Sequence, residues 1–95
     1  MRRVRNVKVL ATLGPASSSE EMIRALFQAG ADAFRLNMSH GTHDDVRAMH
    51  ARIRAIEAEL GRPICILVDL QGPKLRVGKI ADGTVLEEGA SFRLE

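Results

Sequence analysis

The sequence contains no tryptophan and no tyrosine, and its aromatic residues are limited to three phenylalanines. Because 45% of its 95 residues are nevertheless hydrophobic, a folded core has to be built from valine, isoleucine, leucine, alanine and methionine. These side chains suit tightly layered α/β packing better than an aromatic-rich β-sandwich. The length is sufficient for one small domain.

Cysteine is also scarce, since Cys65 is the single thiol of the chain. An internal disulfide is therefore impossible, and nothing indicates an oxidising compartment. Cys65 lies in the apolar run Ile64–Val68, which predicts an inert core residue. No apolar run approaches the ~18 residues that span a bilayer, and no uninterrupted apolar segment follows the basic start of the chain. We therefore expect a cytoplasmic protein that does not bind membranes.

Excess charge of either sign is small, because the formal net charge is only +2. Part of it lies in Arg2, Arg3 and Arg5, which we interpret as a solvated and frayed start of the chain. No aromatic residues alternate with the cations, and no basic run continues beyond this start. This pattern argues against nucleic acid as a partner.

Three short apolar segments have the character of strands. Val7–Leu13 is apolar, partly β-branched and closed by Gly14-Pro15, which predicts a buried strand. Ala33–Asn37 and Ile64–Val68 are the other two candidates. The last of them is apolar without alternation, as is typical of a strand that is covered on both faces.

Two amphipathic helices are predicted between these strands. The first follows a run of three serines, which are good N-caps, and ends at Gly30. The second begins at Thr42, where Asp45 completes a variant capping box, and ends at Gly61. The resulting βαβαβ order predicts right-handed crossovers and parallel strands. Both a doubly wound sheet and a β/α barrel begin in this way, and periodicity leaves that choice open.

The pattern changes after Gly72-Pro73. Leu75–Glu95 contains short apolar pieces that are interrupted by Asp82-Gly83 and Glu88-Gly89, and this spacing is typical of β-hairpins. The last piece stops while it is still strand-like. We therefore interpret Glu95 as a truncation point.

Unusual polar residues gather at the carboxyl ends of the predicted strands, where parallel α/β folds bind their ligands. Arg35 lies within a strand, so its charge needs an anionic partner, either a ligand or a neighbouring carboxylate. Asn37, Ser39 and Asp69 offer the oxygen ligands that hard cations take, although turn formation and helix capping would explain them equally well.

The three histidines do not have the spacing of a zinc site. His40 and His43 lie in one loop, and His50 lies well along the following helix. No cysteine pair or His-Glu signature accompanies them. We interpret them as solvated or capping side chains.

Three segments are specific when they are taken together. They read ATLGPAS (Ala11–Ser17), AGADAFRLNMSHG (Ala29–Gly41) and VDLQGPKLRVG (Val68–Gly78). In order and spacing they resemble successive motifs of the pyruvate kinases, and the resemblance runs from about Lys8 to Glu95.

The resemblance resolves the choice of fold. It implies an α/β protein that starts a (β/α)8 TIM-type barrel, followed by the beginning of an inserted all-β lid domain after the third strand. Residues 1–74 would then form the amino-terminal part of the barrel, and residues 75–95 would begin the lid.

The resemblance also implies a glycolytic transferase that moves a phosphoryl group from phosphoenolpyruvate to ADP, giving pyruvate and ATP. Both substrates are polyanions, so cations and positioning should dominate catalysis. It implies Mg²⁺ as a cofactor, whose carboxylate ligands lie with the catalytic lysine on later strands outside this chain. We expect a homotetrameric intact enzyme and no activity from this chain alone.

Roles for individual residues follow from the same resemblance. Arg35 matches the strand-end arginine that holds the transferring phosphate as a catalytic and substrate-binding residue, where a guanidinium fork suits the phosphate oxygens. Arg76 matches an arginine that reaches the nucleotide phosphates. The nucleotide is further expected beside Asn37, Met38, Ser39 and His40, and a monovalent cation at Asn37, Ser39, Asp69 and Leu70.

This chain reads DLQGPKLR where the commoner family pattern is DTKGPEIR, and the changes of side-chain chemistry are Leu70, Gln71 and Lys74. Lys74 replaces a glutamate, and members with lysine at this position resemble potassium-independent enzymes. An ammonium is itself a compact monovalent cation. We therefore expect that K⁺ is not required.

Two other functions fit part of the sequence. A non-catalytic anion-binding or assembly module derived from the same barrel would keep these loops without the chemistry. A different β/α enzyme that acts on phosphorylated substrates fits the order of elements but not the motif strings.

Overall fold

Three parallel strands form one sheet in the order β1-β2-β3 in the computed structural model, which describes residues 3–93. The strands are β1 (Leu10–Thr12), β2 (Ala33–Asn37) and β3 (Cys65–Asp69). Both pairings are parallel, and each strand lies next to its neighbour in the chain. The βαβαβ order predicted from the sequence is therefore confirmed.

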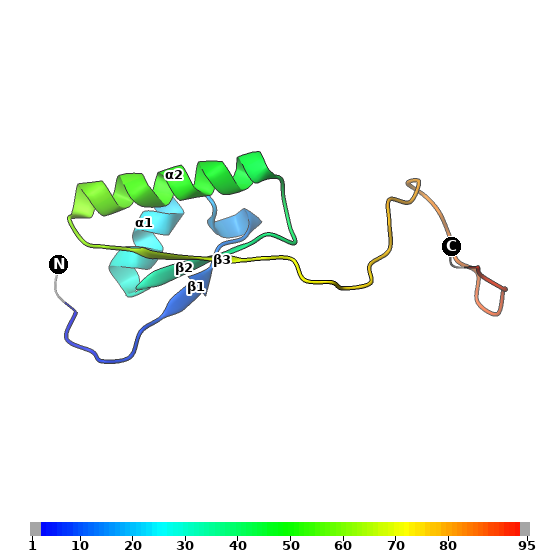
Figure 1. Cartoon of the computed structure of the whole chain (residues 1–95), viewed down its shortest axis with the longest axis horizontal. Helices are drawn as coiled ribbons and strands as arrows, with labels where there is room; N and C mark the ends of the chain where they lie inside the picture. Colours follow the sequence, from blue (N-terminus) through cyan, green and yellow to red (C-terminus); the bar gives the residue numbers. More distant parts are fainter. Residues whose placement is uncertain (1–2, 94–95) are drawn as a thin grey trace.

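Two helices connect the strands. They are α1 (Glu20–Ala29) and α2 (His43–Leu60), and a short 3₁₀ helix, η1 (Pro15–Ser17), follows β1. Figure 1 shows α1 and α2 on the same side of the sheet. The other face of the sheet, called the open face below, carries no helix within residues 3–93.

The helix boundaries follow from local chemistry. The Ser19 hydroxyl accepts a hydrogen bond from the Met22 amide at 3.2 Å and so caps α1. Thr42 and Asp45 form the predicted capping box at the start of α2. Gly61 ends α2 with φ at 62°, in the left-handed region that glycine adopts without a steric penalty.

The core lies between the helices and one face of the sheet. Phe34 and Leu36 alternate along β2 with partly exposed residues and are fully buried, as expected for a strand with one covered face. Apart from two phenylalanines, the core side chains are aliphatic, as the composition predicts. The buried core residues are Leu13, Ile23, Phe27, Ala31, Phe34, Leu36, Ile53, Ile56 and Ile64.

The prediction that Cys65 is a core residue of a strand covered on both faces is wrong for the described residues. Cys65 is exposed, and Leu67 is 43% exposed. Cys65 pairs in register with Ala33, and both lie on the open face, opposite the buried Phe34. The side chains of Ile64–Val68 are apolar on both faces of the strand, but helices cover only one face of the sheet.

The first strand is shorter than predicted. It begins at Leu10 rather than Val7, and Val7 is exposed. β1 begins at Leu10 because its partner strand begins there: Leu10 pairs with Ala33, the first residue of β2. Residues before Leu10 therefore have no strand beside them with which to continue the ladder.

The segment after β3 forms no strand or helix within residues 70–93. Turns do occur at Asp82-Gly83 and Glu88-Gly89, as predicted, but the β-hairpins around them do not form. Apolar side chains such as Leu75 and Phe92 remain exposed, so no buried face stabilises strand pairing. Figure 1 shows this segment running away from the sheet. The last two residues of the predicted strand-like piece lie outside the described residues.

The expectation of a frayed, solvated start is wrong for Arg3 and Arg5, while Arg2 lies outside the described residues. The Arg3 side chain is 9% exposed and its guanidinium lies 4.9 Å from the centre of the Phe27 ring. Arg3 and Arg5 also donate to backbone carbonyls at the end of α1, including that of Gly30. Cations stabilise this end of a helix because its carbonyls carry partial negative charge.

Asp32 is the anion that holds this cluster together. Its carboxylate lies 3.0 Å from Nε of Arg3 and 2.9 Å from Nη1 of Arg5. The Val9 amide donates to the same carboxylate at 2.8 Å. The Val9 hydrogen bond and, after it, the two guanidinium groups hold the pKa of Asp32 below its ordinary value.

Within the part of the chain that the structure describes, neither helix combines the length and the apolar character needed to cross a lipid bilayer.

Asp32→Asn should therefore lower the stability of the protein at neutral pH. A carboxyl group with a depressed pKa in the folded state stabilises that state above its unfolded pKa of about 3.9, and the contribution is lost as pH falls through the folded pKa. The difference in urea midpoint between wild type and variant should thus be present at pH 7 and shrink below pH ~4. Asp82→Asn, at an exposed turn, is the matched control. A difference that is independent of pH would show that the charge of Asp32 has no role.

Candidate functional site

Arg35 and Asp69 form an ion pair on the open face, at the carboxyl edge of the sheet. The Arg35 Nε donates to Oδ2 of Asp69 at 2.9 Å, and its Nη2 contacts the same oxygen. The Arg35 Nη1 lies 3.4 Å from the hydroxyl of Thr12, the residue opposite Arg35 in the register. The side chains of Arg35 and Asp69 are 29% and 45% exposed, so solvent and ligands can reach both.

The strand register brings these groups together. Residues that alternate along a strand point to the same face, so Arg35 and Asn37 share the face opposite Phe34. Asn37 pairs with Asp69 across the β2–β3 ladder. The open face therefore carries a cation and two oxygen-bearing side chains at neighbouring positions.

The loop between β2 and α2 is fixed by its own hydrogen bonds. The Met38 amide donates to the Asp69 carbonyl at 3.0 Å, which ties the loop to β3. The Asn37 Oδ1 accepts from the Ser39 amide at 3.0 Å, and the His40 amide donates to the Asn37 carbonyl at 3.3 Å. These bonds hold the backbone of residues 37–40 and attach it to the carboxyl end of β3.

The capping box continues this ordered loop into α2. The Asp45 Oδ2 accepts from the Thr42 amide at 2.8 Å and from the Thr42 hydroxyl at 3.0 Å. Both hydrogen bonds, led by that from the amide, hold the pKa of Asp45 below its ordinary value. Asp45 therefore remains ionised at neutral pH.

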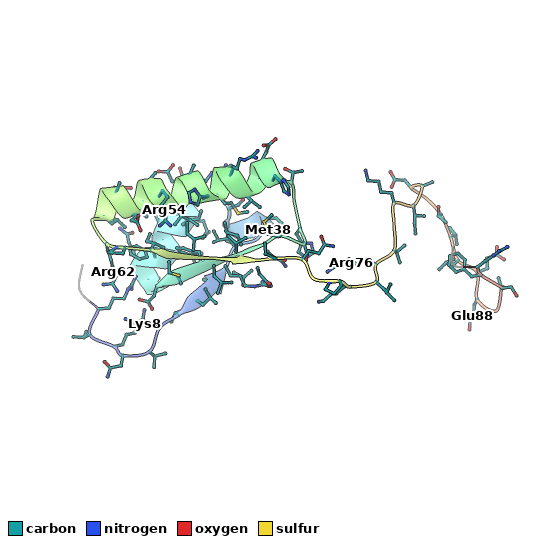
Figure 2. All side chains as sticks on the ribbon, in the orientation of Figure 1. Lys8, Met38, Arg54, Arg62, Arg76 and Glu88 are labelled. Atoms are coloured by element: carbon teal, nitrogen blue, oxygen red, sulfur yellow. The ribbon has the colours of Figure 1, made fainter. Side chains whose placement is uncertain are left out.

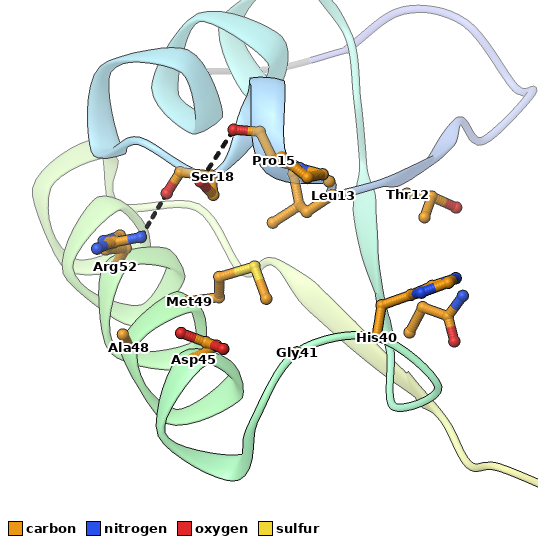
Figure 3. Close-up of a pocket in the computed structure, with 12 residues that line it drawn as sticks. Thr12, Leu13, Pro15, Ser18, His40, Gly41, Asp45, Ala48, Met49 and Arg52 are labelled. Atoms are coloured by element: carbon orange, nitrogen blue, oxygen red, sulfur yellow. Dashed lines mark hydrogen bonds between the residues drawn. The ribbon is translucent and has the colours of Figure 1, made fainter. Parts of the chain in front are cut away.

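A cavity of about 750 Å³ opens beside this loop, between the β1–η1 connection and α2. Figure 3 shows Thr12 and His40 at one end of it, Ser18 and Arg52 at the other, and Met49 between them. Its volume is in the range of small-molecule sites. The cavity is lined by Thr12, Leu13, Gly14, Pro15, Ser18, Asn37, His40, Gly41, Asp45, Ala48, Met49 and Arg52.

Not all of the predicted site residues come together. Arg35, Asn37, Met38, Ser39, His40 and Asp69 lie at the carboxyl edge of β2 and β3 or in the loop after β2. Leu70, Lys74 and Arg76 are exposed on the segment that follows β3. Figure 2 shows Arg76 beyond the edge of the sheet, whereas Met38 lies beside it.

The sequence reasoning missed the inner part of the cavity. Asp45, Ala48, Met49 and Arg52 lie at helical positions i, i+3, i+4 and i+7, so they share one face of α2. This spacing is visible in the sequence, but a polar residue at each end of an apolar pair does not by itself identify a cavity. The opposing wall, contributed by residues 13–18, emerges only from the packing.

The described residues do not form a Mg²⁺ site. Within residues 3–93 no group of three His, Cys, Asp or Glu side chains is arranged to hold a metal ion. Asp69, a carboxylate at the edge of the open face, already has the Arg35 guanidinium as its partner. Asn37, Ser39 and Asp69 do provide the hard oxygen donors that suit a monovalent cation.

A parallel sheet with both helices on one side, and with a charged site at its carboxyl edge, is the arrangement with which a β/α barrel begins. The family described as "Pyruvate kinase, barrel domain" matches residues 4–95, and the chain belongs to the pyruvate kinase family.

Curated relatives agree with this assignment. The chain is 55% identical over 96 residues to a pyruvate kinase of Methylorubrum extorquens, covering 100% of this chain and 20% of the relative. It is 55% identical over 94 residues to a pyruvate kinase of Agrobacterium vitis, covering 98% of this chain and 20% of the relative. A pyruvate kinase of Mycobacterium tuberculosis is 43% identical over 91 residues, covering 95% and 19%. The chain thus spans about a fifth of the length of these relatives.

Thr42→Ala should destabilise the protein by about 1 kcal/mol, because it removes the side chain that caps α2 and anchors the loop carrying Asn37 and His40. The free energy of unfolding from urea titration measures this loss. Thr84→Ala is a suitable control, since the Thr84 hydroxyl bonds only to the Ala81 carbonyl in an exposed turn and should cost less than about 0.5 kcal/mol. Equal losses for the two variants would contradict the role given to the cap.

Proposed function

We propose that this chain contributes part of the substrate site of a cytoplasmic pyruvate kinase, which transfers a phosphoryl group from phosphoenolpyruvate to a nucleoside diphosphate such as ADP, giving pyruvate and ATP. The observation that carries the proposal is the position of Arg35. It is a cation on the open face, at the carboxyl edge of the sheet, beside a cavity large enough for a nucleoside.

Arg35 is suited to hold a phosphoryl group during transfer. Asp69 engages its Nε and Nη2, which fixes the plane of the guanidinium. Nη1 makes only a long contact with Thr12 at 3.4 Å, so its N–H groups can donate to phosphate oxygens in the plane of the guanidinium. Phosphoryl transfer depends on positioning and charge stabilisation, and a pre-aligned guanidinium provides both.

We place the nucleotide in the cavity, with its phosphates toward Arg35 and its base toward α2. His40 lies at one end of the cavity (Figure 3), and Asn37, the last residue of β2, also lines it, so the phosphates and ribose would lie beside these two residues. Leu13 and Met49 supply apolar walls farther in, and such walls suit a planar base. Arg76 would reach the phosphates after the segment that follows β3 folds back over the sheet edge.

Residues outside this chain must complete the site. Three strands do not close an eight-stranded barrel, and the described residues do not fit Mg²⁺. We therefore propose that the Mg²⁺ ligands and the proton-handling groups lie elsewhere in the complete enzyme, and that this chain by itself is inactive.

A hybrid kinase makes the proposal testable. In this hybrid, the present chain replaces the aligned segment of the Methylorubrum extorquens pyruvate kinase, with which it is 55% identical. We expect the hybrid to form pyruvate from phosphoenolpyruvate and ADP. An inactive but folded hybrid, beside an active parent, would favour the alternative of a non-catalytic module.

Arg35→Lys in the hybrid should lower kcat by about a hundredfold or more, because it keeps the charge but removes the planar donor fork from the transition state. Steady-state rates with phosphoenolpyruvate, ADP and Mg²⁺ measure the effect. Arg47→Lys is the matched control, since Arg47 is 76% exposed on α2 and pairs only with Asp44. If Arg35→Lys were nearly as active as the control, Arg35 would have a purely structural role in its ion pair with Asp69.

The hybrid should also work without added potassium. Asp69, the only charged ligand in the proposed monovalent cation site, already has Arg35 as a counter-ion, and Lys74 can add a second positive charge when its exposed segment closes over the site. Rates in buffer free of K⁺ and Na⁺ should therefore lie within about twofold of those in potassium chloride, a difference of under 1 kcal/mol in activation free energy.

Lys74→Glu provides the converse test, because it changes the local charge by two units. This variant should be slow in K⁺-free buffer and should regain activity with potassium chloride. Lys79→Glu, on the same exposed segment, is the control for a general charge effect. Strong activation of the unmodified hybrid by potassium chloride, and not by tetramethylammonium chloride at equal ionic strength, would contradict the proposal.

A further inference from the structure

The inner part of the cavity forms a slot along one face of α2. Ala48 and Met49 make its apolar floor, and Asp45 and Arg52 lie before and after them on the same helix face. Seven residues of α-helix span about 10.5 Å, so the two charged residues are far enough apart to hold a purine between their side chains. The opposite wall comes from the β1–η1 connection, including Pro15.

Arg52 presents hydrogen-bond donors to this slot. It is half-buried, and its Nη1 donates to the Ser18 carbonyl at 2.6 Å, which fixes the guanidinium at the inner end (Figure 3). A guanidinium carries N–H donors on three nitrogens and has no acceptor. The other donors of Arg52 are therefore available to a ligand in the slot, and that ligand has to offer acceptor atoms.

Asp45 presents the opposite chemistry. Its Oδ2 is engaged by Thr42, as part of the helix cap, whereas its Oδ1 makes no hydrogen bond within the described residues. The low pKa of Asp45 keeps this carboxylate ionised, so it acts only as an acceptor. The slot thus has a donor at its Arg52 end and an acceptor at its Asp45 end.

We propose that Arg52 and Asp45 select guanine over adenine, so that a guanosine diphosphate is the preferred phosphoryl acceptor. Guanine carries acceptors at O6 and N7, which a guanidinium binds in a bidentate manner, and donors at N1 and N2, which suit a carboxylate. This inference rests on the proposed function, because it assumes that the cavity holds the acceptor nucleotide.

Adenine has the opposite arrangement on the edge that distinguishes the two purines. Its N6 amino group is a donor and would face the donors of Arg52, and its N1 is an acceptor that would face the Asp45 carboxylate. One bidentate arginine–guanine contact discriminates by about tenfold or more. Inosine diphosphate keeps O6 and N1–H but lacks the N2 amino group, so it should lie between the two.

The test is a comparison of kcat/KM for GDP, IDP and ADP in the hybrid kinase with phosphoenolpyruvate and Mg²⁺. We expect GDP to exceed ADP by about tenfold, with IDP between them. Arg52→Met keeps the length of the side chain and removes its donors, so it should bring the GDP to ADP ratio close to one. Arg52→Lys retains a single charged donor group and should give an intermediate ratio, and this variant serves if the methionine variant does not fold. Arg47→Met, on the exposed side of α2, should leave the ratio unchanged.

The outcomes separate this inference from the proposed function. Turnover with ADP at least as good as with GDP, in an active hybrid, would overturn base selection while leaving the kinase activity in place. A GDP preference that survives Arg52→Met would also overturn it. If the hybrid turned over none of the three nucleotides, the proposed function would be contradicted, and the inference about base selection would be contradicted as well.

Discussion

Arg35 and Asp69 meet on the face of the sheet that no helix covers, and their ion pair joins β2 to β3 at the edge where ligands bind in barrels. The pair sets the direction of the guanidinium, and the Met38 amide bonds to the carbonyl of the same Asp69. One residue of β3 thus positions both the cation and the loop that leads into α2. This loop carries His40, and together with Asn37, the last residue of β2, it lines part of the cavity.

One-sided burial is the physical condition for this arrangement. Phe34 and Leu36 turn toward the helices and lose contact with water, which stabilises the sheet in proportion to the apolar area they bury. Their neighbours Arg35 and Asn37 are then forced onto the open face by the period of the strand. The same alternation that forms the core therefore presents the polar groups. At the other end of the sheet, Asp32 and two arginines secure the first residues of the chain, so the two edges have separate roles.

Features determined by short stretches of sequence were predictable. The β2 bounds Ala33–Asn37, the cap of α2 at Thr42 and its end at Gly61 agree with the pattern because they depend on local alternation and capping. The family motifs likewise identified the polar residues at the strand ends.

Features that depend on distant parts of the chain were not predictable. The exposure of Cys65 depends on which sheet face is covered, and the position of Arg3 depends on Asp32, which is distant in the sequence. The pattern after β3 predicted the two turns correctly but not the strands. Turn residues determine the backbone of their own short segment, whereas a strand forms only when a partner strand lies beside it.

The central claim is that the open-face arginine receives the phosphate of the substrate. A crystal structure of the hybrid kinase with phosphoenolpyruvate and Mg²⁺ measures this directly. Our account predicts that the Arg35 guanidinium lies within about 3 Å of a phosphate oxygen while its Nε stays on Asp69. A bound phosphoenolpyruvate whose phosphate has no contact with Arg35, with the guanidinium turned only toward Asp69 and Thr12, would contradict it.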